Sequence, residues 1–398
     1  MSDLNIFTEG TQQQILDELK VQNALVKVLA SGWNINSFAA VREIVKGGGG
    51  KRYFPVGTQF TVPHTAYGGG SLLFDVVAHD NHKNPNDANA PTMTLLMHHC
   101  IYGRPFDGFE AAYVVTADNY EGGLPAGTYH FLLPTDYAAD ATADGWTGIQ
   151  FTTTKTVPVG GQIVIHGWTY NVHITNVKIR TYESALDMTG IETNLTLTDG
   201  TSGTCLGTFK QNSQAADGVI NHYTRLRYGS NNWNESNIRQ WLNADAASGW
   251  FVQKTPFDRL DSVYANLEGF MNGLDPEFLS VVGAVDVTTR KNSVYESDSD
   301  YGAKVYTTRD KFFLISNDEA GYGVEDIAQG SVLDLYNGAA NADRIKYDLN
   351  SQATARTWWL RSPDPGYAST ARYVVTSGAQ SGNHAYNGLG AAAACVIY

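Results

Sequence analysis

Residues 357–398 read TWWLRSPDPGYASTARYVVTSGAQSGNHAYNGLGAAAACVIY, and this stretch decides the fold of the chain. It begins with the apolar group WWL and ends with the apolar run AAAACVI, whereas from Ser362 to Gly390 only Asp364 and Arg372 are charged. The middle is mostly Gly, Ser, Ala, Asn, Tyr and Thr, a composition that cannot form a core. Tyr among small polar residues is typical of an adaptable binding surface. Because featureless loops of this length are usually functional, we interpret the segment as a displayed surface between two buried anchors.

Further motifs accompany this segment along the chain. NNWNESNIRQWLN occupies 231–243 and TTRDKFFLIS occupies 307–316, and they are followed by TWWLRSP and the terminal GAAAACVIY. In this order the motifs resemble the variable proteins of diversity-generating retroelements, which occur in bacterial phages and prophages. The resemblance covers about 230–398 and extends back to expected strands at 53–103, where FPVGTQFTV and GRPFDGFEAAY resemble phage-encoded members. The AAA at 391–393 departs from the Arg-Pro or Ala-Pro that the family often has there.

The fold class that this resemblance implies is α+β, with a C-type-lectin-like domain whose last strands display a variable region at 357–398. We expect the lectin-like domain to span 51–398 and a helical segment at 1–50 to serve for attachment or oligomerisation. An all-β unit at 112–212 is expected as an insertion, because short strand patterns and Gly or Asn turns follow one another there without a long amphipathic helix.

The resemblance also implies which residues contact a ligand. In such retroelements, mutagenic reverse transcription rewrites adenines of a template copy, so that Asn codons become codons for many other residues. A fixed frame that includes Ala371 and Arg372 then separates the variable positions, and we expect Tyr367, Tyr373 and His384 to converge with Tyr386 on one exposed patch. The implied ligand-binding variable positions are Gly366, Tyr367, Ser369, Thr370, Tyr373, Val375, Ser381, Gly382, Asn383, His384, Tyr386, Asn387 and Leu389.

The amino-terminal segment carries a helical pattern with two interpretations. Apolar residues and one Gln follow a 4-3-4-3 spacing over 12–30, namely Ile15, Leu19, Gln22, Val26 and Leu29. That spacing is the stripe of a short coiled coil with one polar layer, and for a fibre-tip protein it predicts a homotrimer. An amphipathic helix packed on its own domain explains the pattern equally well. A second helix is expected from the N-cap Ser37 to the glycines at 47–50.

The remaining elements follow from periodicity. Alternation predicts strands at 54–62, 72–80, 91–99, 281–287 and 311–316. Short helices are predicted at 237–243, 264–271 and 275–279.

Composition excludes several classes of function. The chain has 398 residues with 27 Lys and Arg against 40 Asp and Glu, so its formal net charge is −13. This balance argues against a nucleic-acid partner and against binding to anionic lipid. No run of 18 apolar residues is present, which argues against membrane insertion. The first ten residues, MSDLNIFTEG, lack the basic and apolar regions of a signal peptide, so none is expected. Three widely spaced Cys do not form a disulfide framework.

We expect neither a metal site nor a nucleotide site. His79, His82, His98, His99 and Cys100 match no zinc-binding spacing, and adjacent histidines on a strand point to opposite faces. Gly47–Gly50 before Lys51 lacks the phosphate-loop order.

Calcium sites are not expected either. The acidic runs at 296–302 and 317–319 lack EF-hand spacing and are interpreted as solvated loops. The sugar-binding motifs EPN and QPD of animal lectins are absent. We therefore expect no metal and no cofactor.

No catalytic motif was found either. The sequence lacks G-x-S-x-G, H-E-x-x-H and C-x-x-C. Formylglycine-generating enzymes share the implied fold but need reactive cysteines, whereas Cys395 lies in an apolar run and is expected to be buried and inert. We expect no enzyme activity and no catalytic residues.

The leading hypothesis is a receptor-binding protein of a phage tail fibre. Its carboxy-terminal region would contact a protein or glycan on the bacterial surface, and its amino terminus would bind other tail proteins. It would be assembled in the host cytoplasm and carried in the virion. Two alternatives remain: a variable protein of cellular origin that binds another ligand, and a tail-spike enzyme that depolymerises a glycan.

Overall fold

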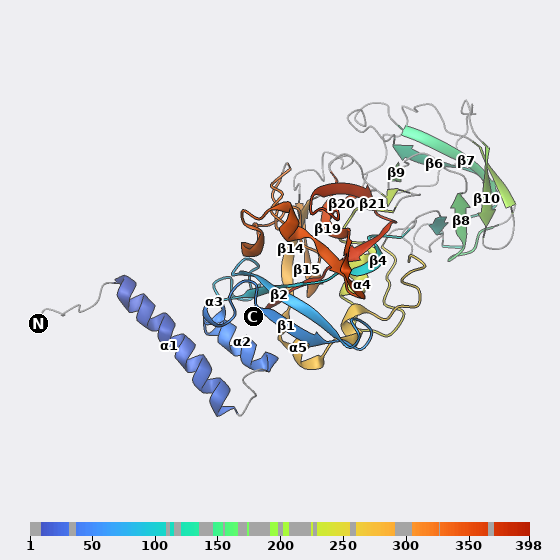
Figure 1. Ribbon diagram of the computed structural model, residues 1–398. Coiled ribbons are helices and arrows are strands. Elements are labelled where there is room, and N and C mark those ends of the chain that lie inside the picture. Colours follow the sequence, from blue (N-terminus) through green and yellow to red (C-terminus); the bar gives the residue numbers. More distant parts are fainter. Residues whose placement is uncertain are drawn as a thin grey trace, which may run out of the picture.

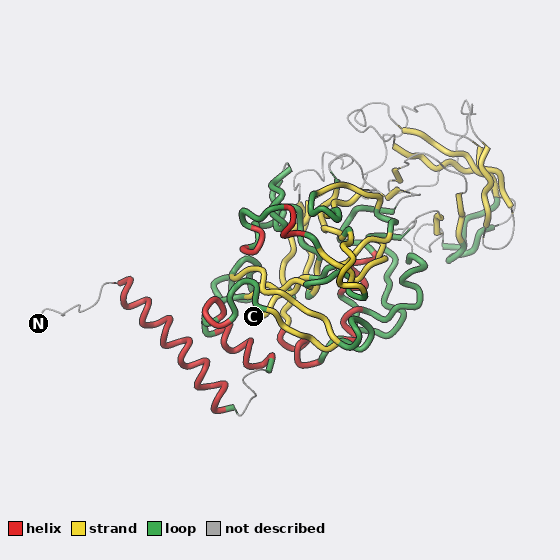
Figure 2. The backbone as a smooth tube through the Cα atoms, in the orientation of Figure 1, coloured by secondary structure: helices red, strands yellow, loops and turns green. Residues whose placement is uncertain are grey.

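The computed structural model of the chain is shown as a ribbon in Figure 1 and as a backbone tube in Figure 2. The residues that it describes are 9–31, 37–108, 112–114, 121–134, 146–153, 156–165, 173–174, 192–197, 202–206, 224–225, 229–254, 260–290, 305–325, 327–364 and 370–398. The described part combines short helices with mostly antiparallel sheets, so the α+β class is confirmed. Within it, no helix is both long and apolar enough to cross a lipid bilayer.

Three helices form the amino-terminal part of the structure. These are α1 (Glu9–Ala30), α2 (Phe38–Lys46) and α3 (Gly50–Tyr53). The predicted N-cap is confirmed, because the Ser37 side chain accepts a hydrogen bond from the backbone N–H of Ala40 at 3.2 Å. Figure 2 shows α1 lying along one side of the body, next to α2 and apart from the sheets.

Helix α1 carries apolar residues on two opposite faces. The inner face packs on the domain through three buried side chains, Val21, Ala24 and Val28. The outer face is the stripe with 4-3-4-3 spacing, and its apolar side chains stay exposed: Ile15 42%, Leu19 52%, Val26 61% and Leu29 71%. The helix therefore packs on its own domain with residues that lie outside the predicted coiled-coil stripe.

The first sheet joins the two ends of the domain. Its strand order is β1-β2-β3-β23-β13, and β16 also pairs with β23. The strands are β1 (Gln59–Pro63), β2 (Ser71–His79), β3 (Met93–Met97), β13 (Val282–Gly283), β16 (Phe312–Phe313) and β23 (Ala394–Ile397). Because β3 pairs with β23 in antiparallel register, the residues near 93–97 and the terminal AAAACVI run share one core.

The second sheet carries most of the candidate binding segment. Its order is β21-β20-β19-β22-β4. The strands are β4 (Ile101–Pro105), β19 (Trp358–Pro363), β20 (Thr370–Val374), β21 (Gln380–His384) and β22 (Gly388–Ala391). Trp358 and Trp359 in the central strand β19 are fully buried, and so are Val396 and Ile397 in β23. Both anchors of the segment are thus part of the core.

A separate sheet lies in the inserted unit, drawn at the upper right of Figure 1. Its order is β5-β8-β10-β11-β7-β6, and β9 and β12 form a two-stranded pair beside it. The strands are β5 (Ala112–Val114), β6 (Gly127–Pro134), β7 (Trp146–Thr153), β8 (Gln162–Ile165), β9 (His173–Ile174), β10 (Glu192–Leu197), β11 (Ser202–Leu206) and β12 (Thr224–Arg225). The two ends of the insertion meet, because a Cβ placed on Gly229 would lie 2.9 Å from the carbonyl oxygen of Gly108.

The remaining elements are short helices and two further two-stranded sheets, β14-β15 and β17-β18. They are α4 (Asn237–Leu242), α5 (Pro276–Val281), β14 (Val285–Arg290), β15 (Val305–Asp310), β17 (Lys346–Asp348), β18 (Ser351–Arg356) and the 3-10 helices η3 (Phe270–Gly273), η4 (Asp334–Tyr336) and η5 (Asn341–Arg344). The predicted helix at 264–271 is wrong, since turns and then η3 occupy that stretch. The predicted strand at 311–316 is shortened to β16, because its buried apolar side chains continue into a loop that packs in the core.

Candidate functional site

The candidate variable positions lie mainly on the β20–β21 hairpin and the turn that follows it. Gly366, Tyr367 and Ser369 lie outside the described residues. Thr370 is only 8% exposed and Leu389 only 7%, so neither side chain adds appreciably to an exposed surface. The other candidate positions are partly exposed.

Strand pairing divides the hairpin into two faces. In β20 and β21, Tyr373 pairs with Ser381 and Ala371 pairs with Asn383. Between these pairs, Arg372 pairs with Gly382. Because successive side chains of a strand point to opposite sides of a sheet, the residues of neighbouring pairs face opposite ways. We call the side with Tyr373, Val375, Ser381 and Asn383 the tyrosine face, and the side with Thr370, Arg372, Gln380, Gly382 and His384 the arginine face.

This division corrects the expectation of a single patch. Tyr373 belongs to the tyrosine face, whereas His384 pairs with Thr370 and belongs to the arginine face. The ring of His384 stacks instead on that of Tyr386, with centroids 6.1 Å apart and an interplanar angle of 17°. Spacing along the sequence does not show this division, because it depends on which residues of the two strands are paired.

The tyrosine face rests on a buried aromatic floor. The Tyr373 ring packs edge-on against Trp359, with centroids 6.1 Å apart. The Trp359 indole donates a hydrogen bond to the carbonyl of Arg104 at 2.8 Å. At the end of the hairpin, the side chain of Asn387 donates to the Asn383 side-chain oxygen at 2.7 Å. The structure therefore brings together four partly exposed candidates here, Tyr373, Ser381, Asn383 and Asn387.

The arginine face is occupied by an ion-pair network. Arg372 contacts Asp364 at 2.9 Å and Glu325 at 2.6 Å, and the Gln380 side chain donates to Glu325 at 3.0 Å. Gly382 leaves the space for this network, since a Cβ there would lie 2.8 Å from an Asp364 carboxylate oxygen. A side chain at position 382 would displace the Asp364–Arg372 pair, so the arginine face is the less tolerant of the two.

A buried ionic cluster supports the strand beneath the hairpin. Arg361 of β19 binds Glu319, and Glu319 also contacts the His82 ring at 3.1 Å. Burial alone would raise the pKa of Glu319, but the charges of Arg361 and His82 hold it at about 2. The prediction of a solvated loop at 317–319 is therefore wrong, because Asn317, Asp318 and Glu319 are all buried.

A second buried polar cluster joins the base of the insertion to the hairpin. Asp107 accepts hydrogen bonds from the backbone of Ser230 at 2.8 Å and from the Asn237 side chain at 2.9 Å. Its own backbone N–H donates to the carbonyl of Ala385 at 3.1 Å. Burial, with the nearby charge of Glu235, raises the pKa of Asp107 to about 7. The carboxyl groups of Asp107 and Glu235 are both buried, so they act here as structural groups rather than as a pair open to substrate.

The histidines that were weighed as metal ligands have other partners. His98 contacts Asp75 at 2.8 Å, and its ring meets that of His99 edge-on at 4.6 Å. The expectation that these two point to opposite faces of a strand is wrong, because β3 ends at Met97 and both lie in the turn that follows. In the described part of the chain, no group of three or more His, Cys, Asp or Glu could hold a metal ion.

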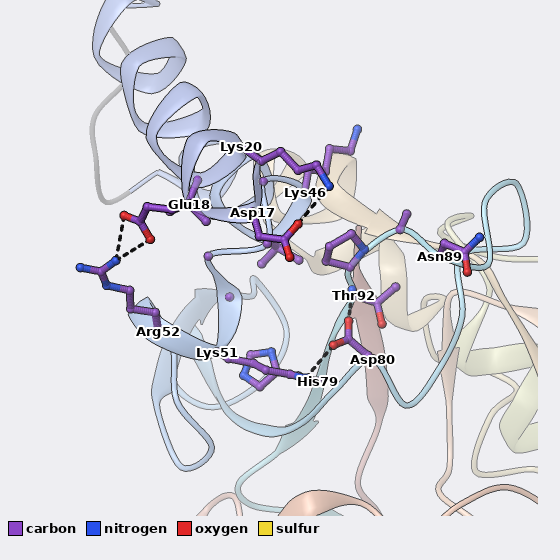
Figure 3. Close-up of a pocket in the computed structure, with 18 of the residues that line it drawn as sticks. Asp17, Glu18, Lys20, Lys46, Lys51, Arg52, His79, Asp80, Asn89 and Thr92 are labelled. Atoms are coloured by element: carbon purple, nitrogen blue, oxygen red, sulfur yellow. Dashed lines mark hydrogen bonds and ion pairs between the residues drawn. The ribbon is translucent and has the colours of Figure 1, made fainter. Parts of the chain in front are cut away.

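A cleft of about 780 Å³ lies between α1, the glycines at 47–50 and the loop before β3 (Figure 3). Three of its cations form ion pairs: Lys51 with Asp80 at 2.9 Å, Arg52 with Glu18 at 3.2 Å and Lys20 with Asp17 at 3.2 Å. Because these three cations already have acidic partners, none of them is free to bind a phosphate.

Comparisons with known proteins give one match. A family model described as a domain of unknown function, DUF6273, matches residues 211–397, just under half of the chain. Neither a curated protein nor a solved structure matches. Strands β3 and β4, which pair with β23 and β22, lie outside the matched residues.

Sequence reasoning missed two kinds of residue that matter to this site. Arg104 and Asp107 both belong to the quoted stretch GRPFDGFEAAY, but nothing in its spacing indicates that Arg104 pairs with Leu389 or that Asp107 hydrogen-bonds to Ala385. Glu319 and Arg361 are far apart in the sequence, and their pairing depends on the register of β19. A charged residue within an apolar run, such as Arg361 after WWL, was the one available signal.

Proposed function

We propose that this protein is a ligand-binding display protein of the retroelement variable type, built on a C-type-lectin-like fold. Three features support the proposal: the motifs quoted above, the α+β architecture, and the pairing of strands from the beginning of the domain with the last two strands. That pairing fixes the carboxy-terminal end of the candidate segment in the core, and β22 also pairs with β19 at the other end.

The observation that carries the proposal is the contrast between scaffold and surface in 370–391. The scaffold is made by backbone pairing and by buried Trp359, Ala371 and Val374, all at 0% exposure. The side chains of Tyr373, Ser381 and Asn383 project from it and are partly exposed. Substitutions at such positions usually change stability by only ~0.5 kcal/mol, so this face tolerates diversification.

The biological setting we propose is the tail fibre of a phage. The target is a protein or glycan of the bacterial surface, reached by the tyrosine face. The helical amino terminus attaches the protein to other tail proteins and assembles it as a homotrimer, because the outer face of α1 is apolar and unused within the chain's described part. Assembly takes place in the host cytoplasm before incorporation into the virion.

Whole-cell binding tests the role of the hairpin. Fluorescently labelled protein is incubated with a panel of bacterial strains, beside a variant with Tyr373→Ala, Ser381→Ala and Asn383→Ala. The matched control carries Ser351→Ala and Gln352→Ala on β18, where both side chains are exposed and which belongs to a different sheet from the hairpin. We expect the triple variant to lose binding to the strains that bind the control. Equal binding by both variants would rule out the tyrosine face as the contact surface.

The neighbouring DNA tests the retroelement assignment separately. We expect a near-copy of the codons for 357–398 that differs mainly at adenines and lies beside a reverse-transcriptase gene. Absence of such a copy in a complete genome would remove the diversification claim, while the binding claim would still stand on the cell assay.

A further inference from the structure

Arg104 lies at the end of β4, directly beside the candidate segment. It pairs with Leu389 of β22, and the pairing then slips, because Ile101 pairs with Ala391. Two residues, Tyr102 and Gly103, therefore oppose Gly390 alone, which is a β-bulge. Gly103 adopts a φ of +78°, in the left-handed region that favours glycine. Bulges of this kind re-aim the next side chain and occur frequently at functional sites.

The bulge places the Arg104 guanidinium over an aromatic platform. Its central carbon lies 5.3 Å from the ring centroid of Trp241 and 5.8 Å from that of Tyr67. Trp241 is fully buried, whereas Tyr67 and Arg104 are partly exposed. A guanidinium stacked on rings keeps its in-plane N–H groups available for a ligand.

Arg104 has no acidic partner among the described residues, unlike Arg239 and Arg356. Arg239 contacts Asp310 at 2.8 Å and Arg356 contacts Asp348 at 2.9 Å. Among the described residues, no carboxylate lies within salt-bridge distance of Arg104, although the chain carries a formal net charge of −13. Within the described residues, its side chain makes one long hydrogen bond of 3.5 Å to the neighbouring carbonyl of Gly103, and its buried Nε has no acceptor there.

We propose that Arg104 binds an oxyanion carried by a sugar, such as the carboxylate of an acidic glycan. A planar guanidinium with unused N–H groups matches a carboxylate or a phosphate through paired hydrogen bonds. The partly exposed Tyr67 ring beside the guanidinium offers an apolar surface to the C–H face of a sugar ring. This assignment rests on the proposed function, since it names the chemistry of a ligand bound at the β4 edge of the same sheet, across β22 and β19 from the hairpin.

Small probes test the site directly. Protein labelled with ¹⁵N-arginine is titrated with glucuronate, glucose 6-phosphate, N-acetylaspartate amide and neutral glucose, and the side-chain Nε–H signals are followed. We expect a saturable shift of the Arg104 signal with glucuronate and at least a tenfold weaker response with glucose, because the ion pair is lost. The phosphate arm distinguishes a carboxylated from a phosphorylated glycan. Binding of the aspartate amide as tightly as glucuronate would overturn the assignment to a sugar.

Variants separate ligand binding from stability. Arg104→Gln removes the positive charge, so we expect loss of glucuronate binding. Arg104→Lys keeps the charge but lacks the paired N–H donors of the guanidinium, so we expect binding to weaken at least fivefold. The control Arg309→Gln changes an exposed arginine that pairs with Asp286 at 2.7 Å, and it should leave binding unchanged. We expect Arg104→Lys to bind glucuronate more weakly while its melting temperature stays unchanged, which separates the loss of binding from any loss of stability.

Two results would overturn the site. One is the absence of any saturable shift at concentrations that fill a millimolar site. The other is unchanged glucuronate binding by Arg104→Gln. Either result is distinguishable from failure of the proposed function, because the cell assay depends on Tyr373, Ser381 and Asn383 and uses no sugar probe.

Discussion

Replacing Leu19 and Val26 by Glu on the outer face of α1 should dissociate the protein without unfolding its domain. Full burial of such a side chain contributes about 1.5–3 kcal/mol. Since the apolar stripe residues are 42–71% exposed in the single chain, an oligomer has about 1 kcal/mol per side chain still to gain. Four such side chains supply about 4 kcal/mol for each helix, or about 12 kcal/mol for three helices. A trimer forms through two associations that each cost ~4–15 kcal/mol, so the gain exceeds the cost at the lower estimates. We therefore expect an assembly that depends on protein concentration.

Sedimentation velocity over a concentration series measures this effect. We expect a trimer for the unchanged protein and a monomer for the double variant, with the same melting temperature for the domain. The matched control is Val28→Asp on the inner face, which is only 1% exposed and should loosen α1 from α2. A monomer in the unchanged protein at tens of micromolar, or a trimer in the double variant, would refute the reasoning about the outer stripe.

Three further changes have defined outcomes. Trp359→Ala should lower the free energy of unfolding by ~3–5 kcal/mol because a fully buried indole is lost, whereas Tyr373→Ala should cost less than about half of that, as chemical denaturation would measure. Arg361→Met should destabilise by ~3–5 kcal/mol, because it leaves the buried Glu319 carboxylate without its arginine partner; a neutral effect would contradict the pairing. Asp107 has a folded pKa of about 7 against an ordinary 3.8, so the folded state binds the extra proton and stability should fall as pH rises through that window. Asp107→Asn should remove this fall when the urea midpoint is measured as a function of pH. An unchanged dependence on pH would contradict the raised pKa of Asp107.

Local patterns in the sequence predicted the elements well where the pattern was itself local. The helix at 12–30 and the N-cap Ser37 are confirmed by α1 and α2, because spacing and capping act within a few residues. The strand at 72–80 is confirmed by β2 for the same reason. Failures came where tertiary packing decides: KFFLIS is apolar enough for a strand, yet only Phe312 and Phe313 pair with β23.

The candidate site was predictable as a segment but not as a surface. Composition located 357–398 and its anchors, since small polar residues and apolar groups separate clearly there. The two faces of the hairpin depend on the register between β20 and β21, which a turn at Gly378 sets and which no spacing rule supplied. Arg104 is placed beside Leu389 by a bulge in a distant strand, so its position required the fold.

The meeting of Gly108 and Gly229 has a consequence for how this protein can change over evolution and in the laboratory. A unit whose two ends leave the body at one point is a side branch of the chain, and its length places no demand on the path of the body. Such a branch can be exchanged for another folded unit, including a reporter, by joining both ends at these two glycines. Related proteins with different inserted units would keep the same hairpin. They would differ in the distance between the hairpin and any surface that the inserted unit contacts.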